Sequence, residues 1–183
     1  MGAWAWVPAM LAFWAAIGGL VTWTHRGQLP MDWLRKPRGS AVWSVAAVLV
    51  GVVSLREFVS GWPVLLSGEV AALWLAFGLI NPWFEEAYWR GLVIDAAGRW
   101  PLAGVVYSAI AFAVSHPLVW GVHSTPLRHP AALVGLGFVG FVWGLAYWRT
   151  RSLRWPIVGH AAANLLGLSV PVLLNLHIPA GLR

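Results

Sequence analysis

The chain has 183 residues, of which 60% are hydrophobic and only 10% are charged. A soluble domain carries about 25% charged residues, so this composition excludes an ordinary soluble protein and predicts an integral membrane protein. The net charge of +6 does not indicate nucleic-acid binding, because the arginines fall in short breaks between apolar runs, where they serve as topology signals. The absence of cysteine excludes disulfides, thiolate nucleophiles and thiolate metal sites.

Apolar segments long enough to cross a bilayer recur along the chain. They predict a single membrane-embedded domain over residues 1–183, an all-α, polytopic transmembrane helical bundle of about six spans. The predicted segments are 3–24, 41–55, 64–99, 101–116, 131–148 and 155–176. Residues 1–63 hold two N-terminal spans, and residues 64–176 form the core bundle. The N-terminus lacks a positive region, so the first segment is expected to be a retained span and not a cleaved signal peptide.

The segment 64–99 is too long for one upright span and contains Pro82. It predicts either a long tilted helix kinked at Pro82, or a span followed by a shorter helix. Near its end, Asp95 can pair with Arg99, four residues on. The next segment is expected to end at Pro117.

The basic breaks of the chain set its predicted orientation. If residues 25–40, the turn at Arg99 and residues 149–154 all face the cytoplasm, both termini lie outside. The protein is expected to lie in the bacterial cell (inner) membrane.

The stretch NPWFEEAYWR, residues 81–90, places two acids and an arginine inside an otherwise apolar region. A charge near the middle of a membrane costs about 2.5–3.5 kcal/mol on insertion scales, so these groups must pair or do chemistry. In a helix, Glu86 and Arg90 are four residues apart and face each other as an ion pair. Glu85 lies about 100° around the helix from Glu86. One acid is therefore expected to be paired and the other to be free.

Three further polar residues lie in apolar context. His116 follows Phe112 by four residues, and His160 and Asn164 are also four apart, separated by alanines that allow a close neighbouring helix. Two histidines, a free glutamate and an asparagine can therefore converge, where they could activate water and stabilise an oxyanion. Helical rise places His116 about 22 Å from the cytoplasmic end of its span but His160 only about 8 Å from the start of its own.

Other interpretations fit the same residues. A histidine in a membrane helix more often forms a helix–helix hydrogen bond than a catalytic site, and His160 with Asn164 could link two helices. A metal-dependent hydrolase could use His116, His160 and a glutamate as ligands, although no His-Glu-x-x-His motif is present. A non-catalytic membrane partner or immunity protein and a proton-coupled transporter are further alternatives, and the lack of repeat symmetry argues against transport.

Three motifs together resemble those of one known family. EEAYWR is similar to the Glu-Glu-x-x-x-Arg motif of the CAAX protease and bacteriocin-processing family (also called Abi), which includes type II CAAX prenyl endopeptidase-like membrane proteins. The segment 112–116 resembles its Phe-x-x-x-His motif, and 160–164 its His-x-x-x-Asn motif. The glycine-rich span, the arginine turn and the final helix follow in the family's order, so the resemblance covers residues 64–176.

The resemblance implies a glutamate-dependent intramembrane protease with an α-helical bundle. By that analogy, Glu85 and His116 hold and deprotonate the attacking water. His160 and Asn164 would stabilise the tetrahedral oxyanion. Burial and a neighbouring histidine would help a carboxylate to serve as the base, and donors at a developing oxyanion are worth about 2.7–4 kcal/mol each in other proteases.

The same resemblance implies that Glu86 and Arg90 brace the site. No cofactor is expected, and a metal is the less favoured alternative. The expected partners are the lipid bilayer and a protein or peptide substrate, with no nucleic acid. Neither the substrate nor the oligomeric state follows from the sequence.

Overall fold

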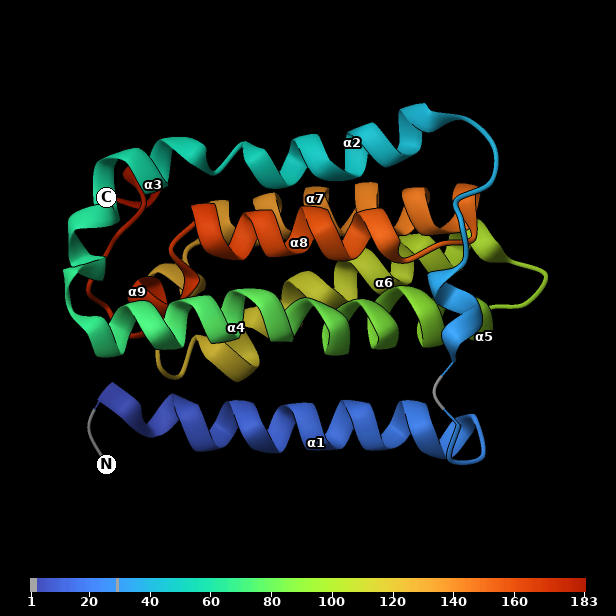
Figure 1. The fold of residues 1–183 in the computed structure, drawn as a ribbon, viewed down its shortest axis with the longest axis horizontal. Coiled ribbons are helices and arrows are strands. Elements are labelled where there is room, and N and C mark those ends of the chain that lie inside the picture. Colours follow the sequence, from blue (N-terminus) through green and yellow to red (C-terminus); the bar gives the residue numbers. More distant parts are fainter. Residues whose placement is uncertain (1–2, 29) are drawn as a thin grey trace.

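The structure, a computed structural model, describes residues 3–28 and 30–183, and within these residues it is all-α with no strand. The long helices lie side by side as a bundle (Figure 1). They are α1 (Trp6–Thr24), α2 (Ala41–Val52), α4 (Gly68–Glu86), α6 (Pro101–Ser115), α7 (Pro130–Thr150) and α8 (Arg154–Leu166). Helix α1 begins, and the C-terminal tail ends, at the same end of the bundle (Figure 1). The predicted all-α bundle is confirmed.

Four segments are long and apolar enough to cross a membrane: Trp6–Thr24, Ala41–Leu66, Pro101–Trp120 and Pro130–Thr150. Their outer faces carry large exposed apolar side chains, as a lipid-facing surface requires. Helices α4 and α8 complete the bundle, although α4 carries the acidic pair and α8 has only 13 residues. These features identify an integral membrane protein.

Helix α4 passes through Pro82 without ending there. It continues into a π-helical stretch, Ala87–Leu92, and then into α5 (Val93–Ala96). The segment is thus one continuous helix, as in the first of the two alternatives. The helix does not divide into two at Pro82, and the irregular stretch lies beyond the acidic pair. Membrane helices tolerate proline where neighbouring helices pack around it, and Pro82 is buried.

Other segment ends also differ from the prediction. Helix α6 does not end at Pro117 but continues as a π-helical stretch, His116–Trp120. The second segment continues past residue 55 as α3 (Leu55–Gly61) and a 3-10 turn, Trp62–Leu66. The final segment, expected to be one span, instead breaks after α8 and resumes as the short helix α9 (Ser169–Leu173).

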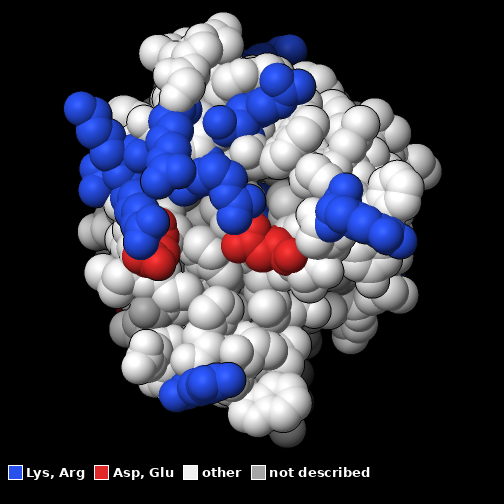
Figure 2. All heavy atoms as spheres, turned by 90° about the vertical axis from the view of Figure 1, so that its right-hand side faces the viewer, with Lys and Arg blue, Asp and Glu red and all other residues white. Residues whose placement is uncertain are grey.

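The basic segments gather at one end of the bundle, where Lys and Arg side chains cluster on the surface (Figure 2). Here Asp95 pairs with Arg151 at 2.9 Å, not with Arg99, and also accepts hydrogen bonds from Trp33 and Tyr147. The sequence-based pairing with Arg99 is therefore wrong, because a tertiary contact across the bundle replaces the local one. These bonds hold the segment between α1 and α2 against the bundle.

Helices α2 and α8 approach each other through two glycines. A Cβ atom added at Gly51 would lie 2.0 Å from the Gly159 carbonyl oxygen, and one at Gly159 would lie 1.9 Å from the Ala47 carbonyl oxygen. Only glycine allows backbones to meet this closely. The contact brings α2, an N-terminal span, against the helix that carries His160.

Candidate active site

The two adjacent glutamates on α4 point in different directions. Glu86 Oε1 lies 3.3 Å from Arg90 Nη1, and both side chains are fully buried, which confirms the predicted ion pair. Glu85 is also buried, but it lines a cavity that neither Glu86 nor Arg90 lines. The helix therefore separates a paired acid from one that faces open space.

Arg90 lies among aromatic rings as well as beside an acid. Its guanidinium carbon is 4.3 Å from the centroid of the Phe112 ring and 5.4 Å from that of Trp143. Such stacking suits the planar guanidinium and partly offsets the cost of burying its charge. The π-helical stretch that contains Arg90 follows directly after the acids, and π turns often occur at functional sites.

His160 on α8 connects the two acids. Its Nδ1 lies 2.8 Å from Glu86 Oε1 and its Nε2 lies 3.5 Å from Glu85 Oε2. The ring stacks on Trp143, with centroids 4.7 Å apart and planes at 17°. Trp143 is itself fixed, because its Nε1 donates to the Ala47 carbonyl oxygen at 2.9 Å. The position of the imidazole thus depends on α2, α4 and α7 together.

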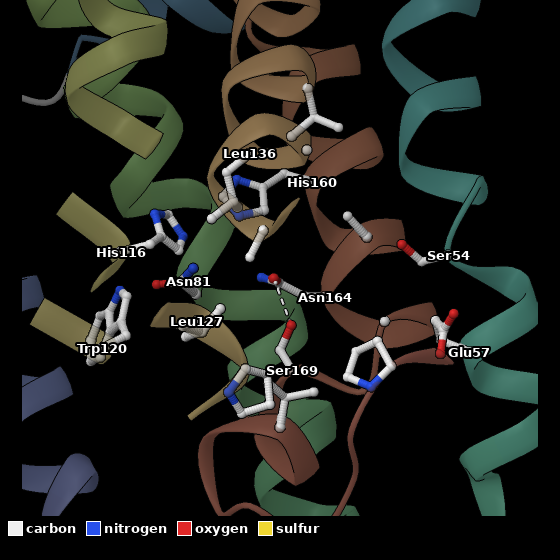
Figure 3. A pocket seen from close by; sticks show the side chains of 18 of the residues that line it. Ser54, Glu57, Asn81, His116, Trp120, Leu127, Leu136, His160, Asn164 and Ser169 are labelled. Atoms are coloured by element: carbon white, nitrogen blue, oxygen red, sulfur yellow. Dashed lines mark hydrogen bonds between the residues drawn. The ribbon is translucent and has the colours of Figure 1, made fainter. Parts of the chain in front are cut away.

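His116 has a defined tautomer in its neutral form. Its Nδ1 lies 2.7 Å from the Phe112 carbonyl oxygen, one turn earlier. Because a carbonyl oxygen only accepts, Nδ1 must carry the hydrogen, and Nε2 is left as an acceptor. The ring is buried and lines the same cavity as Glu85 (Figure 3). An acceptor nitrogen that lines a cavity can accept a hydrogen bond from a water molecule there.

Asn164 presents an amide group with one end fixed. Its Oδ1 accepts a hydrogen bond from Ser169 Oγ at 3.1 Å (Figure 3). Its Nδ2 is buried and has no hydrogen-bond partner within the part of the chain that the structure describes. Buried donors are nearly always paired, so an unpaired one that lines a cavity is available to a ligand.

The cavity that joins these groups has a volume of about 420 Å³. Glu85 lines it together with His116, His160 and Asn164, and most of the remaining wall is apolar. Figure 3 shows how the two histidines and the asparagine lie around this cavity. Residues of α2 and of the C-terminal tail also contribute to its wall, so the lining extends beyond the predicted core of residues 64–176. A space of this size can hold a short peptide segment.

The register of the helices removes the expected difference in depth between the histidines. Ser108 Oγ on α6 donates to the Trp89 carbonyl oxygen at 2.6 Å. Because α6 and α4 run antiparallel, eight residues along each brings His116 to the level of Asn81, one turn from the acidic pair. His160 reaches that pair from α8, so both rings face one cavity.

Sequence reasoning assigned no role to three residues at this site: Asn81, Trp143 and Ser169. Asn81 is buried, lines the cavity and accepts a hydrogen bond from Trp14 Nε1 at 2.8 Å. Its position four residues before Glu85 was a usable signal. Trp143 and Ser169 carry no such signal, because their contacts cross between helices. Within the described residues, no group of three or more His, Cys, Asp or Glu side chains is arranged to hold a metal ion.

Taken together, the fold and the site define a polytopic membrane protein with a buried cluster of acid, histidine and amide groups. Comparison with protein families gives a matching result: the model of the family described as "Type II CAAX prenyl endopeptidase Rce1-like" matches residues 67–166. This match covers more than half of the chain, and the chain belongs to this family. Searches of curated proteins and of solved structures give no match.

Membership of this family confirms the resemblance inferred from the three motifs. It also supports the general kind of function expected, that of a CAAX-type protease embedded in a membrane. The lipid bilayer and a peptide substrate are the partners that follow. The individual roles of the site residues stay predictions.

Proposed function

We propose that the chain is a glutamate-dependent intramembrane endopeptidase that hydrolyses a peptide bond in a membrane-proximal or lipidated substrate. One observation carries the proposal. The acid that is not paired with arginine shares one cavity with both motif histidines and the motif asparagine. If these polar side chains served only to join helices, they would be hydrogen-bonded to one another. Here the acid, the histidines and the asparagine all line the cavity.

The proposed base is Glu85, assisted by His116. A water molecule between them donates one hydrogen to the Glu85 carboxylate and the other to His116 Nε2, the acceptor nitrogen. As the water oxygen bonds to the substrate carbonyl carbon, its proton passes to Glu85. When the carbon–nitrogen bond breaks, Glu85 gives that proton to the leaving amine, so the products are a carboxylic acid and an amine.

The proposed oxyanion site consists of Asn164 and His160. Among the described residues, Asn164 Nδ2 is a buried donor with no protein partner, and Asn164 lines the same cavity as the proposed base. His160 Nε2 lies at the same wall, and because Nδ1 is used by Glu86, donation from Nε2 requires the doubly protonated ring. One donor at an oxyanion contributes about 2.7–4 kcal/mol in other proteases.

Glu86 and Arg90 are proposed to brace the site and not to touch the substrate. Their ion pair is buried behind the cavity wall, and Glu86 also fixes the ring of His160. Second-layer groups of this kind hold catalytic side chains in a productive geometry. We further propose that the reaction needs no metal ion and takes place in a bacterial inner membrane.

The test is a cleavage assay with the pure protein in liposomes, using a library of membrane-anchored peptides and mass spectrometry of the products. Wild type should release peptides, and Glu85→Gln should release none. Glu69→Gln is the matched control, because Glu69 is an exposed acid at the start of the same helix. Equal cleavage by wild type and Glu85→Gln would exclude Glu85 as the base.

A further inference from the structure

Ser169, which lies outside the three family motifs, contacts the proposed oxyanion donor directly. Its Oγ donates to Asn164 Oδ1 at 3.1 Å, and it also lines the cavity (Figure 3). No other hydrogen bond is formed by this hydroxyl in the described part of the chain.

An amide group has two ends of opposite character. Its oxygen accepts and its nitrogen donates, and a half-turn about the last side-chain bond exchanges their positions. A hydroxyl can either donate or accept, and in the orientation that the structure shows, the Ser169 hydroxyl donates to Oδ1. Among the described residues, that orientation leaves Nδ2 as the end without a protein partner. The opposite one would place a carbonyl oxygen where negative charge develops, which is repulsive.

The backbone between the two residues is shaped for this contact. Helix α8 ends at Leu166, and Leu168 takes the left-handed conformation with φ 53° before α9 begins at Ser169. Non-glycine residues rarely adopt this conformation, and it persists only where the surroundings impose it. Leu168 is fully buried, and its side chain occupies the space that a side chain at Gly61 would fill. The turn brings the Ser169 hydroxyl back toward α8.

We propose that Ser169 is a positioning residue that holds the Asn164 amide with its NH₂ group toward the scissile carbonyl. This inference rests on the proposed function, because it concerns the orientation of the oxyanion donor. It predicts that the serine hydroxyl matters in the transition state and not in substrate binding.

The kinetic test compares Ser169→Ala with Ser169→Thr and Ser124→Ala in the liposome assay. Ser169→Ala should lower kcat at least tenfold with KM unchanged, and Ser169→Thr, which keeps a hydroxyl, should stay close to wild type. Ser124→Ala is the matched control, because Ser124 Oγ also holds α9, through the Val172 carbonyl oxygen at 2.7 Å, without touching Asn164. In an Asn164→Ala background, Ser169→Ala should cause no further loss.

A second measurement does not depend on activity. The chain has only three asparagines, so ¹⁵N-asparagine labelling in detergent gives three side-chain amide signals, and Asn164→Ala assigns one of them. The Asn164 signal should shift or broaden in Ser169→Ala and stay unchanged in Ser124→Ala. An unchanged signal in Ser169→Ala would overturn the inference. If that signal does change while wild type cleaves no peptide, the orienting contact stands and the proposed function fails.

Discussion

Among single residues, Glu85 and Glu86 are consecutive in the sequence and yet have different surroundings. Glu86 contacts Arg90 and His160 Nδ1, while Glu85 has His160 Nε2 at 3.5 Å and also lines the cavity. A buried charge is costly unless it is paired, and Glu86 meets that condition through two partners. Burying an acid beside a cavity lowers the stability of the folded protein, and such costly positions for titratable groups are found most often at functional sites.

The two histidines provide a residue-scale prediction on metal ions. The proposed reaction uses no metal, and among the described residues no three His, Cys, Asp or Glu side chains are arranged to hold one. Cleavage should therefore survive exhaustive dialysis against EDTA, and metal analysis of the pure protein should give much less than one ion per chain. Loss of cleavage on chelation, restored by added zinc, would favour a metal-dependent hydrolase instead.

Among the helices, the contact between α2 and α8 has the strictest steric requirement. The backbones meet at Gly51 and Gly159, and His160 is the next residue along α8. The N-terminal spans are therefore part of the site's support, although the family match begins only at residue 67. Any group that separates these helices should move the imidazole.

Gly159→Ala tests this contact. The new methyl group would lie 1.9 Å from the Ala47 carbonyl oxygen and 2.9 Å from Trp143 Nε1, so the helices must shift. Overpacking of this kind costs about 1–3 kcal/mol. We expect a lower melting temperature in detergent and a lower cleavage rate. Gly19→Ala is the control, since nothing lies within 4 Å of its added Cβ; an equal effect of both substitutions would refute the steric argument.

The sequence predicted the elements of this fold better than their ends. Four-residue spacing correctly paired Glu86 with Arg90, because both lie on one helix. It failed for Asp95, whose partner Arg151 follows directly after the end of α7. Proline was over-interpreted at Pro82 and Pro117, because bundle packing lets the helix continue past both. The contact of Ser169 with Asn164 depends on the break between α8 and α9, which no sequence pattern indicated.

For the whole molecule, the arrangement of charge has a consequence for orientation. The basic segments lie at one end of the bundle, and the start of α1 and the C-terminal tail lie at the other (Figures 1 and 2). Arginine and lysine near the ends of membrane helices favour the cytoplasmic side. The basic end is therefore expected to face the cytoplasm.

Cysteine labelling tests this orientation, and the natural chain, which has no cysteine, provides a clean background. Ser40 and Ser67 are both exposed, and they cap the starts of α2 and α4. In intact cells, Ser67→Cys should react with a membrane-impermeant maleimide, whereas Ser40→Cys should react only after the cells are opened. The reverse pattern would invert the proposed topology.

The most direct test of the proposed mechanism is to measure melting temperature and cleavage rate together for Glu85→Gln and Glu86→Gln. Glu86→Gln leaves Arg90 buried without its counter-charge, a change that costs about 3–5 kcal/mol in other proteins, so stability and activity should fall together. Glu85→Gln removes an acid that faces the cavity, so the protein should remain folded and lose turnover. If Glu85→Gln unfolds while Glu86→Gln is folded and inactive, the two roles are reversed. If both variants cleave at the wild-type rate, the catalytic account is wrong.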